Sequence, residues 1–211
     1  MSNVVLIDYG SGNLPSAAKA LAVAAGDPAR VIVSDDPEIV AKADRVVLPG
    51  VGAFTACMKA LQSRPGLIEA MNEAVQTRGA PFLGVCVGMQ LLATRGLEFG
   101  DYPGLDWIPG EVSVLQPSDA GFKVPHMGWN ALSDVSDHAL LAGLGEAPHM
   151  YFTHSYAFAP TDRADIAAGV DHGGGFAALV ARGNVAGAQF HPEKSQANGL
   201  RLLSNFLEWT P

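Results

Sequence analysis

The feature that most constrains this chain is the alternation of short apolar runs with helix-like stretches in its first half. Apolar residues follow one another in the runs at residues 3–8, 30–34, 45–50 and 81–86. Strands of this kind are buried on both faces, which is typical of a parallel sheet covered by helices. The helical patterns lie at residues 13–25, 53–61, 67–77 and 87–93, with Asn13 as a cap and Gly26 as a stop for the first. We therefore predict an α/β fold with a central, mostly parallel sheet and helices on both faces.

The second half of the chain has a different pattern. The stretches "EVSVL", "HMYFTHSYAF", "FAALVAR" and "VAGAQFH" alternate more and are separated by turns such as "DHGGG". This pattern predicts antiparallel strands that extend or edge the same sheet, and a last helix at residues 200–207. Neither a repeat nor a linker divides the sequence, so we expect a single domain over residues 1–211.

Composition excludes several classes of protein. The net charge of -8 argues against nucleic acid as the main partner. The sequence contains no run of about 18 apolar residues, so no membrane-spanning helix is expected. The apolar stretch at the N-terminus is too short for a signal peptide, and it lacks the basic residues with which a signal peptide starts. Two cysteines do not make a disulfide framework. We expect a cytosolic protein with reduced thiols.

Cys86 lies between two glycines in "GVCVG", where an apolar run meets a helical pattern. The Gly-x-nucleophile-x-Gly form is that of a nucleophile elbow, with Cys in place of Ser. The N–H groups of a helix that starts at Val87 would favour the thiolate. A buried cysteine at an ordinary strand end explains the same five residues, and the motif alone leaves both interpretations open.

The stretch "QFHPEKS" adds a base and its partner. His191 and Glu193 are two residues apart at the end of an expected strand, so both project to the same side. The carboxylate can then accept from one imidazole nitrogen while the other faces a thiol. By itself the stretch could be an exposed strand end. Together with Cys86 it favours a Cys-His-Glu triad.

Other motifs carry less weight. The loop in "LPGVGAF" could direct N–H groups at a developing oxyanion, or it could be a plain glycine turn. "DYGSGNLP" lacks the third glycine of a dinucleotide-binding loop, because Pro15 stands there. Residues 173–175 predict a hairpin turn. Cys57 lies in a helical segment and is interpreted as packing, and the histidines show no metal-ligand spacing.

These motifs, in this order, resemble those of the class I glutamine amidotransferases. "LPGVGAF", "GVCVGMQLL" and "QFHPEKS" carry the general resemblance. Within that class, "DYGSGNLPSAAKAL", "KVPHMGWN" and "YFTHSYAF" are similar to the glutaminase subunits of imidazole glycerol phosphate synthase. The departures are Pro15 in the first helix cap, and Asp106 with Trp107, which could alter a surface loop.

The resemblance implies roles for individual residues. Cys86 would be the nucleophile, His191 the base and then the acid, and Glu193 the group that orients His191. Backbone N–H groups of Gly52 and Val87 would form the oxyanion hole. No metal or other cofactor is implied. The residues expected to hold the amino-acid end of L-glutamine are Gln90, Glu98, Ser155 and Tyr156.

The resemblance also implies a partner, a (β/α)₈ cyclase subunit that takes the ammonia before water protonates it. "KVPHMGWN" has no place in the thiol chemistry, and Pro125 and Gly128 make it look irregular. Trp and Met are enriched at interfaces, although Trp129 could equally be a core residue. The expected interface residues are Asn13, Lys123, His126, Met127, Trp129 and Lys194.

Three rival functions remain at this point. The chain could be another class I glutaminase, such as one that serves pyridoxal phosphate synthesis, although "KVPHMGWN" argues against this. It could be a cysteine peptidase or related hydrolase, or a non-catalytic scaffold subunit, for which an intact triad would have no use.

Overall fold

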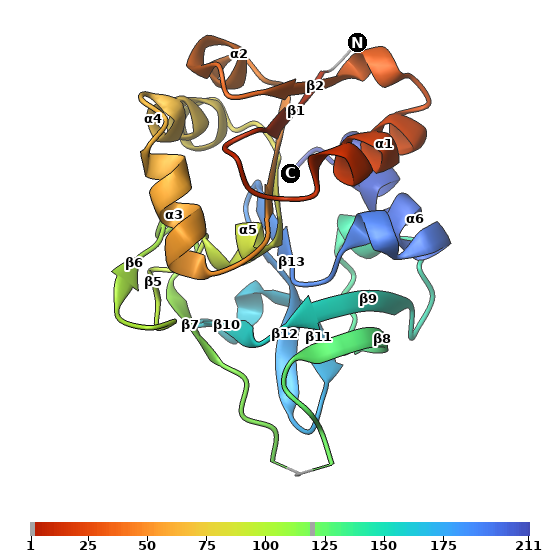
Figure 1. The fold of residues 1–211 in the computed structure, drawn as a ribbon. Helices are drawn as coiled ribbons and strands as arrows, with labels where there is room; N and C mark the ends of the chain where they lie inside the picture. The colour runs from red at the N-terminus through yellow and green to blue at the C-terminus, as the bar shows by residue number, and fades with distance from the viewer. Residues whose placement is uncertain (1–2, 119–120) are drawn as a thin grey trace.

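A nine-stranded sheet runs through the molecule (Figure 1). The structure is a computed structural model that describes residues 3–118 and 121–211. The strand order is β2-β1-β3-β4-β13-β12-β11-β8-β9. In that order the strands are β2 (Val31–Ser34), β1 (Val4–Ile7), β3 (Arg45–Gly50), β4 (Phe82–Cys86), β13 (Val185–Ala188), β12 (Gly175–Arg182), β11 (Ile166–Asp171), β8 (His126–Ser133) and β9 (His149–His154).

The sheet is parallel from β2 to β13 and antiparallel beyond β13. Every residue of β1, β3, β4 and β13 is buried. Three of the four continuous apolar runs are therefore buried strands, whereas the run at residues 30–34 forms the partly exposed edge strand β2. The predicted fold class is confirmed.

Helices cover both faces of the parallel half. The helices α1 and α6 lie together on one side, and α3 and α4 lie on the other (Figure 1). As expected, Asn13 caps the first helix by accepting from Ser16 N, and Gly26 ends it with φ +66°. The helices are α1 (Leu14–Ala25), α2 (Pro37–Ala41), α3 (Phe54–Gln62), α4 (Leu67–Asn72), α5 (Val87–Gln90) and α6 (Gln196–Glu208).

Several helix boundaries differ from the prediction. The helix expected at residues 67–77 changes after Asn72 into a π-helical turn, η2 (Glu73–Thr77). The helix expected at 87–93 ends at Gln90, and the last helix begins at Gln196 rather than at residue 200. Short 3-10 turns complete the chain: η1 (Pro28–Arg30), η3 (Ala139–Leu141), η4 (Arg163–Asp165) and η5 (Pro192–Lys194).

A second sheet corrects the prediction for the C-terminal half. Four strands form it, in the order β10-β7-β5-β6. "EVSVL" and the end of "HMYFTHSYAF" belong to this sheet and not to the large one, because the chain leaves the large sheet after His154. The strands are β10 (Tyr156–Pro160), β7 (Gly110–Val114), β5 (Arg95–Gly96) and β6 (Tyr102–Pro103).

Three further expectations change. "VAGAQFH" contains β13, which is antiparallel to β12 but parallel to β4. "PHMGWN" is not irregular, since it forms the first part of β8. Trp107 does not merely alter a loop: its ring packs edge-on against Phe82, and its Nε1 donates to Asn72 Oδ1 at 3.1 Å.

Two other features agree with the sequence. Residues 172–174 form the expected turn between β11 and β12, and Cys57 is buried in α3. In the part of the chain that the structure describes, no helix is long and apolar enough to cross a bilayer.

Candidate active site

The backbone around Cys86 has the strained geometry of an elbow. Cys86 ends β4 with φ +55° and ψ -112°, a conformation that costs energy for a residue with a side chain. The flanking glycines are needed because backbones meet there. A Cβ on Gly88 would lie 1.9 Å from Leu48 O, and one on Gly84 would lie 2.4 Å from Gly88 O. The glycines thus allow α5 to pack directly on the sheet, with Cys86 at the turn. Since α5 is one turn long, it offers the sulfur a shorter helix than expected.

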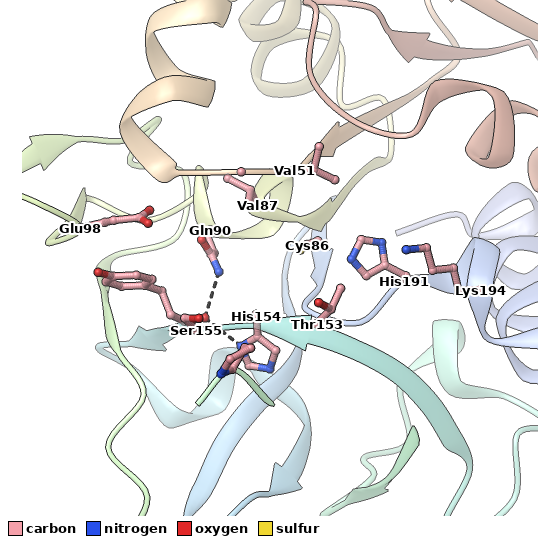
Figure 2. Close-up of a pocket in the computed structure, with 13 residues that line it drawn as sticks. Val51, Cys86, Val87, Gln90, Glu98, Thr153, His154, Ser155, His191 and Lys194 are labelled. Atoms are coloured by element: carbon pink, nitrogen blue, oxygen red, sulfur yellow. Dashed lines mark hydrogen bonds between the residues drawn. The ribbon is translucent and has the colours of Figure 1, made fainter. Parts of the chain in front are cut away.

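A cavity of about 370 Å³ opens over this elbow (Figure 2). Its walls come from the ends of β3 and β4, from α5, and from the β9–β10 connection on the opposite side. The lining residues are Val51, Gly52, Cys86, Val87, Gln90, Glu98, Pro125, Thr153, His154, Ser155, Tyr156, His191 and Lys194. All the residues expected at the nucleophile, oxyanion hole and glutamine site therefore share one cavity, with Glu193 behind His191.

His191 has one nitrogen paired and one free. Its Nδ1 lies 2.8 Å from Glu193 Oε1, and both side chains are buried. Its Nε2 is buried and makes no hydrogen bond to any residue that the structure describes. The expected contact is present, but the reason given for it was wrong. Strand β13 ends at Ala188, so the 3-10 turn η5, rather than strand alternation, brings Glu193 back to His191.

The surroundings of His191 favour its protonated form. Burial is the largest single effect and opposes the charge, but the interactions with the neighbouring Cys86 and with Glu193 together outweigh it and raise the pKa of His191 from 6.5 to about 9. The imidazole is therefore a strong acceptor for a proton from the neighbouring thiol, and Glu193 stabilises the imidazolium that results.

Gln189 is a site residue that the sequence reasoning missed. It is fully buried, and its Nε2 lies 3.8 Å from Cys86 Sγ. Its Oε1 accepts from Gln90 Nε2 at 3.0 Å. Its place in the same short motif as His191, "QFHPEKS", was the signal that could have indicated it.

Hydrogen bonds from two other segments fix the loop that is expected to form the oxyanion hole. The hydroxyl of Ser11 accepts from Val51 N at 3.2 Å and donates to Val51 O at 3.0 Å. Cys57 Sγ also donates to that carbonyl, at 3.4 Å. These contacts fix the peptide next to Gly52, whose φ of +97° requires a glycine. Neither Ser11 nor Cys57 was expected to support this loop.

The expected glutamine-binding residues converge from opposite walls. Gln90 Nε2 donates to Tyr156 O at 3.0 Å (Figure 2). Glu98 is buried and accepts from Phe54 N at 2.6 Å, so it also caps α3. Ser155 lies at the corner where the chain passes from β9 to β10.

The expected interface residues fall into two groups. Met127 and Trp129 on β8 are 64% and 48% exposed, and Asn13, Lys123 and Lys194 are exposed as well. His126 does not belong with them, because its side chain is only 3% exposed and faces inward. The cause is strand alternation: in β8 the residues next to Met127 point to the opposite face.

Among residues 3–118 and 121–211, no group of three or more His, Cys, Asp or Glu side chains could hold a metal ion. The residues with polar side chains that line the cavity are Cys86, Gln90, Glu98, Thr153, His154, Ser155, Tyr156, His191 and Lys194.

Comparison with known proteins gives consistent matches. The model of the family "Glutamine amidotransferase class-I" matches residues 5–209. A protein of Caulobacter vibrioides named imidazole glycerol phosphate synthase subunit HisH is 59% identical, with 100% of each chain covered. The protein of the same name from Rhodospirillum rubrum is 56% identical, with 99% of each chain covered.

A solved structure described as a glutamine amidotransferase has the same fold. Its TM-score is 0.74 at 22% identity, with 98% of each chain covered. The chain therefore belongs to the class I glutamine amidotransferase family and, within it, to the HisH subunits of imidazole glycerol phosphate synthase.

Proposed function

We propose that this protein is the glutaminase subunit of an imidazole glycerol phosphate synthase and hydrolyses L-glutamine to glutamate and ammonia. The observation that carries the proposal is the buried His191, which is paired with Glu193 through Nδ1 and leaves Nε2 free in the cavity that contains Cys86. The family membership and the full-length likeness to HisH subunits give the reaction and its pathway, histidine biosynthesis.

The first half of the reaction forms a thioester. His191 takes the proton of Cys86, and the thiolate attacks the carbon of the side-chain amide. The carbonyl oxygen becomes an oxyanion, to which the N–H groups of Gly52 and Val87 donate. When the tetrahedral intermediate collapses, the C–N bond breaks and His191 returns its proton to the leaving nitrogen, which departs as ammonia.

The second half releases glutamate. His191 takes a proton from a water molecule, and the hydroxide attacks the thioester carbon through a second oxyanion. The C–S bond then breaks, and the sulfur of Cys86 regains a proton from His191. Glu193 stays ionised throughout and stabilises the imidazolium in both halves. Gln90, Glu98 and the backbone of Ser155 and Tyr156 hold the amino-acid end of the substrate.

The ammonia passes to a partner. Free ammonia in neutral water is mostly protonated and is no longer nucleophilic, so a direct transfer to a (β/α)₈ cyclase subunit is part of the proposal. That subunit would make imidazole glycerol phosphate and aminoimidazole carboxamide ribotide. Met127, Trp129, Lys123, Lys194 and Asn13 remain the proposed contacts. The cytosolic location and the single domain also remain predictions.

The test is a purification of this chain together with the cyclase subunit of the same source. We expect glutamate release and the cyclase products in equal amounts when glutamine is supplied, and neither from glutamine with a Cys86→Ala variant. Hydrolysis of peptides in place of glutamine, or no glutamate release from the complex, would contradict the proposal.

A further inference from the structure

A hydrogen-bonded chain of side chains leads from the cavity wall, where His154 lies, towards β8 and takes no part in the proposed reaction. It consists of Asn130, His126 and His154, and we call it the histidine chain. His126 Nδ1 lies 3.0 Å from His154 Nε2, and Asn130 Nδ2 lies 3.2 Å from His126 Nε2. At its other end, His154 Nδ1 lies 2.8 Å from Tyr156 O. Both histidines are more than nine-tenths buried.

The two ends of the histidine chain fix the direction of every bond in it. The carbonyl of Tyr156 can only accept, so His154 carries its proton on Nδ1 and its Nε2 is an acceptor. His126 must then donate from Nδ1 and accept at Nε2. Asn130 supplies that donor: its Oδ1 accepts from Ala131 N at 2.9 Å, so its nitrogen is the atom that faces His126. Each neutral imidazole thus has a single tautomer that satisfies both of its neighbours.

The positions of the rings support this arrangement. His126 stacks on Phe152, with ring centroids 4.7 Å apart, and on His172, with centroids 4.1 Å apart. Burial, followed by repulsion from His154 and His172, lowers the pKa of His126 to about 3. Burial also lowers the pKa of His154 to about 4, against the opposing effect of its bond to Tyr156. Both rings are neutral at physiological pH, as the bond directions require.

The histidine chain ends at a corner of the backbone. Residues 154–156 form the corner where the chain leaves β9 of the large sheet and enters β10 of the small one. Tyr156 O accepts from His154 Nδ1 on one side and from Gln90 Nε2 on the other (Figure 2). Both lone pairs of this oxygen are therefore used. Through it the corner is linked to α5 by Gln90, and to β8 by His154 and His126.

We propose that His126 and Asn130 are positioning residues, which act through His154 to fix the Ser155–Tyr156 corner against which glutamine binds. The inference rests on the proposed function, since it concerns the same site. Asn130 anchors the outer end, because its Nδ2 also donates to Asp171 O at 2.8 Å. His126 thus has a role inside the protein and not at the partner surface.

The first test is spectroscopic and does not depend on activity. In the wild-type protein, the ¹⁵N shifts of both His126 and His154 should show a protonated Nδ1 and an unprotonated Nε2 at pH 7. A His126→Phe variant keeps a ring between Phe152 and His172 but donates nothing, so the His154 Nε2 signal should move towards that of an unprotonated nitrogen without a donor, while the proton stays on Nδ1. A wild-type spectrum with either ring protonated on Nε2 would overturn the proposal.

The second test is kinetic and uses the complex with the cyclase. The His126→Phe variant should raise the KM for glutamine by about two- to tenfold, the effect of one lost hydrogen bond, with little change in kcat. A His126→Asn variant places an amide donor near the position of Nδ1 and should restore part of the KM. The matched control is His172→Phe, which changes a stacked ring outside the histidine chain and should leave the KM unaltered.

The outcomes separate the two proposals. A wild-type complex that releases no glutamate from glutamine would end the proposed function, and this inference with it. An active wild type whose His126→Phe variant folds and keeps its KM would overturn this inference alone. If that variant fails to fold, two results still test the inference. These are the tautomers of His126 and His154 in the wild type and the KM of the His126→Asn variant.

Discussion

Replacing Glu193 by Gln isolates the charge that the triad places behind His191. The amide oxygen of Gln can still accept from Nδ1, so the orientation of the ring is kept while the negative charge is lost. An opposite charge at this distance favours the ionised partner by roughly 1–3 pKa units. The pKa of His191 should therefore fall from about 9 by at least about one unit.

The stability change follows from the same shift. A pKa raised from 6.5 to about 9 corresponds to roughly 3–4 kcal/mol at about 1.4 kcal/mol per unit, and both Cys86 and Glu193 contribute to it. The one-unit fall in the pKa expected above for the Glu193→Gln variant is equivalent to a loss of at least about 1 kcal/mol. Because the folded-state pKa is raised, this stabilisation is fully present below pH 6.5 and is lost as the pH rises through about 9. The difference in unfolding free energy between wild type and variant should shrink over that window.

Two measurements check the loss of stability and the fall in the pKa of His191. Urea unfolding at pH 6 and at pH 9.5 gives the free-energy difference, and an NMR titration of the His191 ring gives its pKa. The control is Glu208→Gln, which changes an exposed carboxylate at the end of α6. Glutamate release should fall by as much as roughly 10⁴ through kcat, with glutamine still bound. A His191 pKa that stays near 9 in the variant, or an effect on KM alone, would refute the role assigned to Glu193.

Three further outcomes are expected. Cys86→Ala should abolish glutamine hydrolysis in a folded protein, while the complex still makes product from ammonium salts at high pH; retained hydrolysis would remove Cys86 from the mechanism. Trp129→Ala should weaken cyclase binding by at least about 1 kcal/mol in titration calorimetry without unfolding the subunit by circular dichroism, and unchanged affinity would place Trp129 outside the interface. Gly88→Ala should destabilise the fold by about 2 kcal/mol or more in thermal unfolding, because its Cβ would lie 1.9 Å from Leu48 O. Gly175→Ala, where no described atom lies within 4 Å of the added carbon, is the control, and equal effects would contradict the packing argument.

The parallel half of the fold could be predicted because its signal is local. A strand buried on both faces is almost entirely apolar, as β1, β4 and the part of β3 after Arg45 are. Strand β13 is buried as well, but it was expected to be antiparallel because it lies among the alternating stretches. The alternating stretches of the second half indicate strands, but alternation does not say which sheet a strand joins. The division into two sheets depends on the corner at Ser155, where tertiary contacts decide the path of the chain.

The site was predictable where short motifs indicate local structure, and the resemblance joined those motifs into one site. The glycines around Cys86 indicate an elbow because close backbone contact excludes any side chain, and the structure has that contact at Gly88. Gln189 and Ser11 were missed because their partners, Cys86 and Val51, are far away in the sequence. His126 was misplaced for a related reason: a short motif with Pro and Gly concealed a regular strand.

Strand β8 shows why "PHMGWN" supported both a core and an interface interpretation. Successive side chains of a strand point to opposite faces, so Met127 and Trp129 are exposed while His126 is buried between them and the cavity wall. The buried face of the motif fits the core interpretation, and the exposed face is the one that the proposed interface requires. The outer face is open to a partner, and the inner face ends, through His154, at Tyr156 O in the proposed glutamine site. Strand β8 thus lies between the proposed cyclase surface and the proposed substrate site. Substitutions on its outer face are expected to change cyclase binding, and substitutions on its inner face are expected to change glutamine binding.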